Sequence, residues 1–261
     1  VKFQQNTGTS GKNNKITQTS KLQTSILNLL FNTGGEYTGQ WGSLQWGTGS
    51  ASVTRTAEDA FIGRYSYKLA SSDSGTTIMN IQQAAVTPGQ TYTFSSYVKI
   101  GALNQPAPGD GAFAAVSYLN GSGATVMAYS ETVTVAGSWD KVSVTFTLPA
   151  DAASGTVTVR TGFCGSGYAY FDCMQLETGE TANRYNMVEN SSFELVNSDG
   201  TTAYWTGSAG TSSSTRLKFG FRSGQVTGSA TEDRFFKQSF AVNSPGASEK
   251  DAYVFGCWAK G

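Results

Sequence analysis

Acidic side chains are the groups with which this chain could do acid–base chemistry, because its 261 residues include no histidine. That absence excludes Ser-His-Asp and Cys-His nucleophile systems and histidine-based zinc sites. A glycosidase needs only two carboxyl groups, and Glu177 with Glu180, or Asp110 with Glu131, meet this minimal requirement. These residues lie in predicted turns, where we expect water to solvate them. The sequence therefore favours a protein that is not an enzyme, with a carboxylate-based glycosidase as the less favoured alternative.

Aromatic side chains on the wet face of a sheet are the candidates for ligand contact, because the C–H face of a sugar stacks on an aromatic ring. Tyr97 points away from Phe94 in an alternating segment, and Trp258 holds the matching position later in the chain. Strand phase leaves the orientation of the other candidates open. For each candidate the alternative is packing against a neighbouring strand. The predicted ligand-binding residues are Tyr97, Tyr118, Tyr129, Trp41 and Trp258.

The elements that position these residues are predicted β-strands. Residues 92–98 and 142–148 alternate apolar and polar side chains, as strands do when one face covers a core. Gly, Ser, Asn, Asp and Pro separate the segments and predict turns. Further strands are expected at about 66–70, 77–86, 111–119, 124–130, 155–164 and 168–176. This pattern predicts an all-β fold, a β-sandwich of the jelly-roll type.

The chain carries the same domain-sized pattern twice, and the second copy is incomplete. Glu194 follows Glu36 by 158 residues, and Pro245 follows Pro88 by 157. A repeat of this length is a whole domain and not a solenoid unit. We therefore predict three regions: a linker or the tail of a preceding element at 1–26, a first module at 27–185, and the N-terminal half of a second module at 186–261.

Two expectations follow from this repeat. Trp46 and Trp205 hold matching positions, and Trp139 begins a strand with an apolar face, so we expect all three to be core or wall residues. A half sandwich exposes apolar faces and open sheet edges. Residues 186–261 are therefore expected to be disordered, to aggregate, or to be completed by another chain.

Charge and cysteine content exclude several classes of partner. The chain has 18 basic and 18 acidic residues, so no positive field favours nucleic acid or an anionic membrane. No apolar run is long enough to insert into a membrane, and the first residues lack signal-peptide features, so export would be encoded upstream. Three cysteines are too few for a disulfide framework. Cys164 and Cys173 lie on either side of a predicted hairpin turn, but that turn would not place them opposite each other, so we expect no disulfide between them. We expect buried free thiols instead, which favours a bacterial surface protein.

The order of the short motifs resembles a known family. Those motifs are Asn28-Leu29-Leu30, Asn32, Glu36, Trp46, Gly63-Arg64-Tyr65-Ser66, Tyr92-Thr93-Phe94, Ser138-Trp139, Tyr170-Phe171-Asp172 and Gln175-Leu176-Glu177. Together they resemble carbohydrate-binding-module-like jelly rolls of the galactose-binding type, and the opening of the second copy, 189–194, is closer still. The segment 170–185 is similar to modules of large secreted YD-repeat (Rhs or wall-associated) proteins of Gram-positive bacteria.

The resemblance implies a non-catalytic β-sandwich that often holds one structural calcium ion and sometimes binds glycan on its concave face. Asp172 lies in the predicted last strand, where an uncompensated carboxylate near a core is costly. Family members place such an Asp beside a Glu near the start of the domain, and Glu36 matches that position. Glu194 matches it in the second copy, where the Asp partner would lie beyond this chain. Without calcium, Asp172 would pair with Arg64 or Arg184, or both carboxylates would be exposed.

We therefore interpret the chain as two non-catalytic carbohydrate-binding-like modules of a bacterial surface or secreted protein, placed outside the cell or in the cell wall. They would bind glycan or serve as a spacer, with calcium as the only expected cofactor. The alternative is a structural or adhesive module whose incomplete second copy pairs with a protein partner or another copy. Glycan binding predicts Tyr97 exposed in a groove, whereas a structural role predicts it covered by a loop or partner.

Overall fold

The protein is an all-β chain. The computed structural model describes residues 27–208, 210–217, 220–239, 257 and 259, which form strands, turns and loops. No helix able to cross a membrane occurs in these ranges. The strands are β1 (Gly42–Trp46), β2 (Ala51–Thr56), β3 (Ser66–Ser71), β4 (Thr77–Ala85), β5 (Thr91–Asn104), β6 (Gly111–Leu119), β7 (Thr125–Tyr129), β8 (Asp140–Thr147), β9 (Thr156–Cys164), β10 (Ser166–Thr178), β11 (Thr206–Ser208), β12 (Gly210–Ser213), β13 (Ser223–Val226) and β14 (Phe235–Lys237).

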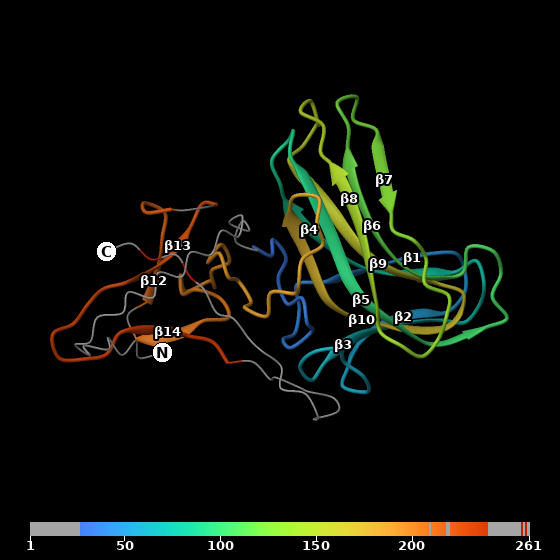
Figure 1. Cartoon of the computed structure of the whole chain (residues 1–261), viewed down its shortest axis with the longest axis horizontal. Coiled ribbons are helices and arrows are strands. Elements are labelled where there is room, and N and C mark those ends of the chain that lie inside the picture. Colours follow the sequence, from blue (N-terminus) through green and yellow to red (C-terminus); the bar gives the residue numbers. More distant parts are fainter. Residues whose placement is uncertain (1–26, 209, 218–219, 240–256, 258, 260–261) are drawn as a thin grey trace, which may run out of the picture.

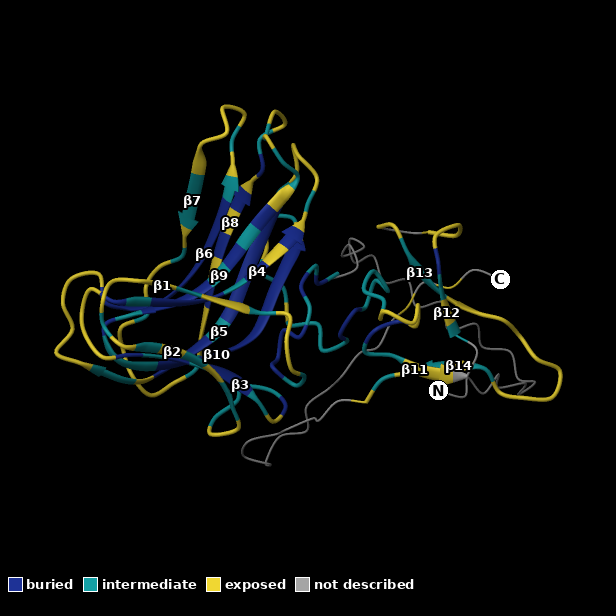
Figure 2. Cartoon of the chain, turned by 180° about the vertical axis from the view of Figure 1, so that it is seen from behind, coloured by how far each residue is buried: buried dark blue, intermediate teal, exposed yellow. Residues whose placement is uncertain are grey.

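The first ten strands form a two-layer sandwich, seen on the right of Figure 1. One sheet has the order β1-β4-β9-β6-β7 and the other β2-β3-β10-β5-β8. Each strand buries alternate residues between the sheets: along β8, Val142, Val144 and Phe146 are buried while Lys141 and Ser143 are exposed. Figure 2 shows these buried strand segments in dark blue. Burying one such side chain stabilises the fold by about 1.5–3 kcal/mol. The predicted β-sandwich is confirmed.

All eight strands predicted from alternation are present, as β3 to β10. The two that sequence missed, β1 and β2, are edge strands with mostly exposed or half-buried residues, so they carry little apolar alternation. The predicted hairpin between Cys164 and Cys173 is wrong, because β9 and β10 belong to different sheets and the chain crosses between them at Gly165. Both cysteines are free; Cys173 is buried and Cys164 half-buried.

A bulge in β10 shapes the region where the chain enters the sandwich. The pairing of β10 with β5 shifts between Asp172 and Gln175, and Cys173 takes a left-handed conformation (φ 53°). Beyond this shift the Met174 amide donates to the Thr33 carbonyl at 3.1 Å. The bulge therefore serves as the attachment point of the opening loop, residues 28–41.

Asn32 holds the opening loop closed. It is fully buried in a left-handed conformation (φ 51°). Its Nδ2 lies 2.9 Å from the carbonyl oxygens of Tyr37 and Gly39 and from Tyr67 Oη, while its Oδ1 accepts from the Tyr37 amide. One side chain thus satisfies three backbone polar groups of the loop, the Tyr37 and Gly39 carbonyls and the Tyr37 amide.

The strands that follow residue 186 have counterparts in the sandwich. Strand β11 pairs with β14 as β1 pairs with β4, and β12 pairs with β13 as β2 pairs with β3. Asn190 bonds the carbonyl groups of Leu195 and Ala203 and the Leu195 amide, as Asn32 does in its own loop. The predicted division into modules stays a prediction, and the segment 1–26 lies outside the described residues.

The expected match of Trp46 with Trp205 is wrong, because the hydrogen bonds of the two loops make another tryptophan the counterpart of Trp205. Trp205 Nε1 donates to the Asn190 carbonyl, and Trp41 Nε1 donates to the Asn32 carbonyl. Trp41 is therefore the counterpart of Trp205. The second loop, residues 186–205, is longer than the opening loop by an insertion. Trp46 instead lies on β1 with 44% of its surface exposed, so it is not a core residue.

We predict that Asn32→Ala lowers the free energy of unfolding by about 2–4 kcal/mol, because several buried backbone groups lose their partner at once. Urea denaturation followed by tryptophan fluorescence measures the change. The control is Asn104→Ala at the exposed end of β5, which we expect to be neutral. Equal stability of the two variants would contradict the role given to Asn32.

Candidate functional site

The outer side of the β1-β4-β9-β6-β7 sheet carries an aromatic and cationic surface. We call it the aromatic face and define it by Trp46, Met79, Phe113, Tyr129 and Arg160. Register places these residues on one side: across the sheet Met79 pairs with Gly162 and Gly162 with Phe113, while Arg160 pairs with Ala115 and Ala115 with Tyr129. Trp46 joins this side through its pairing with Thr77, which lies two residues from Met79 on β4. The other four each alternate with a core-packed residue on their own strand, since side chains along a strand point to opposite faces.

Two exposed rings stand at opposite edges of the aromatic face. Tyr129 on β7 is 51% exposed and Trp46 on β1 is 44% exposed. Four strand spacings separate their strands, a width of about 19 Å. The Phe113 ring lies 5.8 Å from that of Tyr129 and covers Gly162, where an added Cβ would approach Phe113 Cζ to 2.4 Å. Gly162 is therefore needed for Phe113 to lie against the sheet.

Arg160 supplies a hydrogen-bond donor at the centre of this face. Its Nη1 donates to Ser117 Oγ at 2.6 Å and to the Thr158 carbonyl at 3.1 Å. Its Nε is buried and has no hydrogen-bond partner among the described residues. Burial lowers the pKa of the guanidinium, although the nearby Tyr129 raises it. A guanidinium held in this way places a fixed cation on the face, which suits a hydroxyl or carboxylate of a ligand.

Tyr97, the leading candidate from sequence, is covered. Its ring stacks on Phe61 at a centroid distance of 3.8 Å and an interplanar angle of 13°, and Trp139 lies 5.9 Å from the same Phe61. Phe61 belongs to residues 57–65, the connection from β2 to β3. Of the two alternatives for Tyr97, the structure matches cover by a loop and not exposure in a groove: the ring is half-buried, and the loop that stacks on it has a course that the strand pattern does not reveal.

The other predicted aromatic residues have separate places. Tyr118 stacks on Phe146 at 5.9 Å and packs against the core. Trp41 donates to the opening loop, so it is a wall residue. Trp258 lies outside the described residues. Of the described members of the predicted set, Tyr129 alone stands on the aromatic face. Sequence reasoning missed Trp46 because it expected a core or wall residue there. It missed Phe113 and Arg160 because only the strand register shows which side of the sheet they share.

Asp172 is a fully buried carboxylate that forms no ion pair with any described residue. Its Oδ2 accepts from the amides of Phe61 (2.8 Å) and Ile62 (3.1 Å), and its Oδ1 accepts from the Cys173 amide (2.6 Å). Burial raises its pKa to about 7. The ion pairs among the described residues are Lys68–Glu58, Lys99–Asp59 and Arg234–Glu232. The expected alternatives, a pair with arginine or full exposure, are therefore both wrong for Asp172.

Glu36 and Asp172 are brought together around Gly34. A Cβ added at Gly34 would lie 3.6 Å from Asp172 Oδ1 and 3.9 Å from Glu36 Cγ. Glu36 Oε1 accepts from the amides of Arg64 and Tyr65. No group of three or more His, Cys, Asp or Glu that could hold a metal occurs within the described ranges. A cation in this cradle would therefore need backbone carbonyl oxygens beside the two carboxylates, the mixed oxygen set that suits calcium.

Glu194 repeats the contacts of Glu36 in its own loop. Its Oε1 accepts from the amides of Phe221 (2.9 Å) and Arg222 (3.1 Å). Gly220 lies beneath it in a left-handed conformation, as Gly63 lies beneath Glu36. Glu194 therefore lies in the second loop and is not part of the cradle that Glu36 and Asp172 form.

The carboxyl pairs considered for glycosidase chemistry each combine a structural group with an exposed one. Buried Glu177 accepts from the Asn183 amide and side chain. Buried Asp110 accepts from Ser74 Oγ and the Ala107 amide. Glu180 and Glu131 are exposed. The buried members hold loops in place, which gives them a structural role.

Glu189 joins the second loop to the first. Its side chain is buried; Oε2 accepts from the Asn32 amide at 2.8 Å, and Oε1 from the Thr33 amide at 2.9 Å. The pKa of its carboxyl is raised because burial outweighs these hydrogen bonds. Tyr185 adds a hydroxyl contact with Thr33 at 2.7 Å. No sequence pattern signals this contact, because its two sides lie 156 residues apart.

Comparison with known proteins gives a family and several partial likenesses. The model of a family described as "Carbohydrate binding domain" matches residues 23–167. The tRNA nuclease WapA of Bacillus subtilis (strain 168) is 45% identical over 58 residues, which is 21% of this chain and 2% of that protein. The chain thus spans only a small part of the curated relatives it matches.

Solved structures with partial likeness include two carbohydrate-binding modules. A family 16 module has a TM-score of 0.42 at 23% identity, covering 58% of this chain and 97% of that one. The C-terminal family 22 module of Clostridium thermocellum Xyn10B has a TM-score of 0.43 at 19% identity, covering 61% of this chain and 99% of that one.

The raised pKa of Glu189 predicts a pH dependence of stability. A carboxyl that binds its proton more tightly when folded contributes stability in full below its ordinary pKa of about 4.3, and loses it as pH rises through the raised value. We expect wild type to lose stability relative to Glu189→Gln as the pH rises above about 4.3. Urea denaturation at several pH values measures this, with the exposed Glu180→Gln as control. Parallel pH profiles of wild type and Glu189→Gln would contradict it.

Proposed function

Because this chain belongs to the carbohydrate binding domain family, we propose that the aromatic face of its sandwich binds a glycan. The observation that carries the proposal is the combination, on one side of one sheet, of two exposed rings with the half-buried guanidinium of Arg160. Sugar rings stack on aromatic faces, and their hydroxyls need donors such as a guanidinium. Tyr97 offers no such surface because Phe61 covers it.

The placement of the two rings favours an extended glycan chain over a single sugar. Trp46 and Tyr129 stand on the two edge strands of the sheet, with Phe113 and Arg160 between those edges. A ligand that contacts both rings must therefore cross all five strands. Phe113 and Met79 are buried against the sheet and give this path an apolar floor.

The module would act as a non-catalytic part of a larger bacterial protein. The curated relatives are Bacillus proteins of which the matched segment is 2%. We place the parent protein outside the cell or in the cell wall, with its chemistry elsewhere in the chain. A spacer role is the second candidate function, and the buried contact of Glu189 with the first opening loop favours it, because that contact holds the two regions together.

The glycan proposal is tested by a glycan array in calcium-containing buffer, followed by titration calorimetry with the best ligand. We expect Trp46→Ala and Tyr129→Ala each to weaken binding about tenfold, which corresponds to a lost stacking contact of about 1.4 kcal/mol. Phe221→Ala removes an aromatic side chain that is 79% exposed and lies off the aromatic face, and it should bind as wild type does. A folded protein silent across the array would favour the spacer role instead.

We further propose that Glu36 and Asp172 hold a structural calcium ion together with backbone carbonyl groups. The support is the cradle at Gly34 and the absence of an ion-pair partner for buried Asp172 among the described residues. Bound calcium would supply the positive charge that this carboxylate lacks.

We predict that calcium raises the melting temperature of wild type by at least about 4 °C, since ligand binding to the folded state stabilises it. Asp172→Asn and Glu36→Gln should each lose that increase, while Glu131→Gln, at an exposed carboxyl, should retain it. Differential scanning calorimetry with calcium and with EDTA measures the shift. No shift in wild type, with no heat on titration of calcium, would contradict the site.

A further inference from the structure

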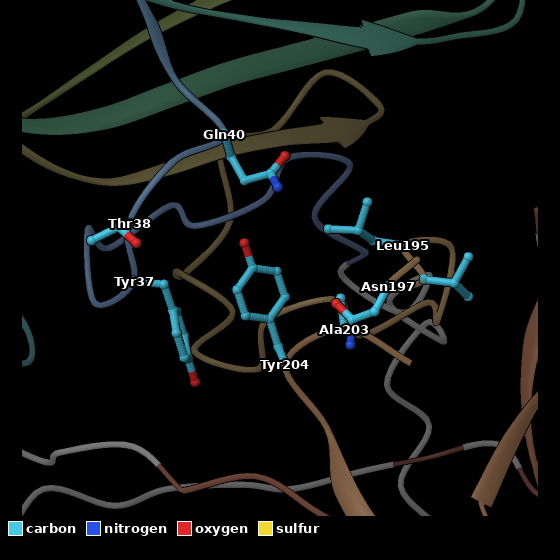
Figure 3. A pocket seen from close by; sticks show the side chains of 8 residues that line it. Tyr37, Thr38, Gln40, Leu195, Asn197, Ala203 and Tyr204 are labelled. Carbon is cyan, nitrogen blue, oxygen red and sulfur yellow. The ribbon is translucent and has the colours of Figure 1, made fainter. Parts of the chain in front are cut away.

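A cavity of about 400 Å³ lies where the two opening loops meet (Figure 3). Tyr37, Thr38 and Gln40 come from the loop that precedes β1. Leu195, Asn197 and Tyr204 come from the corresponding loop that precedes β11. Its walls therefore belong to two regions of the chain, and neither region encloses it alone. It is separate from the aromatic face.

The side chains around this cavity combine rings with neutral hydrogen-bonding groups. The rings of Tyr37 and Tyr204 lie 4.6 Å apart at an angle of 56°. In Figure 3 the hydroxyl of Tyr204 and the amide of Gln40 point toward one another across the space. The cavity lining contains no charged side chain. Rings that stack and amides that both donate and accept match an uncharged sugar, and nothing in this lining would compensate an acidic one.

Backbone conformation aims two of these side chains into the cavity. Gln40 (φ 73°) and Tyr204 (φ 67°) both take the left-handed conformation that residues other than glycine rarely adopt. Side chains held in such strained positions are found where function requires them. Because the two residues occupy corresponding places in the two loops, the same strain occurs on both sides of one cavity.

Hydrogen bonds hold that backbone in place on both sides. Gln82 Nε2 donates to the Gln40 carbonyl at 3.0 Å, and Gln238 Nε2 donates to the Tyr204 carbonyl at 3.1 Å. The buried contacts of Glu189 with the first loop fix the two loops relative to each other. The cavity is therefore preorganised, which lowers the entropy that a ligand must lose on binding.

We propose that this cavity is a second saccharide subsite, which binds one uncharged sugar unit against the contacting rings of Tyr37 and Tyr204 and exists only where the two loops meet. The ligand class rests on the proposed function, while the location does not. The subsite would give the contact between the two loops a function, because the chain would bind glycan where the loops meet as well as on the aromatic face.

Titration calorimetry on the full chain tests this proposal. The probes are linear neutral hexasaccharides of β-1,4-linked glucose, xylose and galactose, with an oligogalacturonate as the acidic comparison. The key variant is Tyr204→Gln, which removes the ring and installs the residue type that already holds this conformation at position 40. Phe221→Ala is the matched control for loss of an exposed aromatic side chain.

We expect two sites for a neutral probe on wild type. Tyr204→Gln should lose one of them, with at least a tenfold fall in its affinity, and Tyr129→Ala should weaken only the other. If Tyr204→Gln binds as wild type does while Tyr129→Ala loses binding, the cavity proposal is wrong and the proposed function stands. If only Tyr204→Gln loses binding, the cavity stands and the aromatic face is wrong. Preference of the cavity for the acidic probe would overturn the assignment to an uncharged sugar.

Discussion

Closure of the opening loop by one buried asparagine is the constraint on which the described structure depends. Asn32 bonds both sides of its loop, so the chain can turn inside the sandwich without leaving amide groups unpaired. Its amide and that of Thr33 remain available as donors, and Glu189 accepts from both. The bulge in β10, the cradle around Gly34 and the contact with the second loop all adjoin this turn.

The two outer faces of the sandwich differ because loops treat them differently. On the β2-β3-β10-β5-β8 sheet, Phe61 covers one face of Tyr97, and amides of the same loop bind Asp172. On the opposite sheet, Trp46 and Tyr129 stay exposed at the edges. The proposed glycan surface and the proposed calcium site thus lie on different sides of one core.

The second loop contributes more than a repeat of the first. Where the first loop has Phe31, the second has Glu189, whose carboxylate accepts hydrogen bonds from the backbone of the first loop. Where the first has Gln40, the second has Tyr204, which places a ring beside Tyr37. Two substitutions at corresponding positions thus account for both the attachment of the loops and the character of the cavity between them.

Sequence by itself determined the all-β class and eight of the ten sandwich strands, because alternation is a local property, and the family resemblance brought Glu36 and Asp172 together. The choice of Tyr129 as a ligand contact stays a prediction. Sequence expected Trp46 in the core or wall, and it left Tyr97 open between exposure in a groove and cover by a loop. Tertiary structure decided those points, since exposure of a ring depends on which distant loop folds over it. The junction of Glu189 with Asn32 was equally beyond sequence, because the hydrogen bond is specified by a contact between residues 157 positions apart.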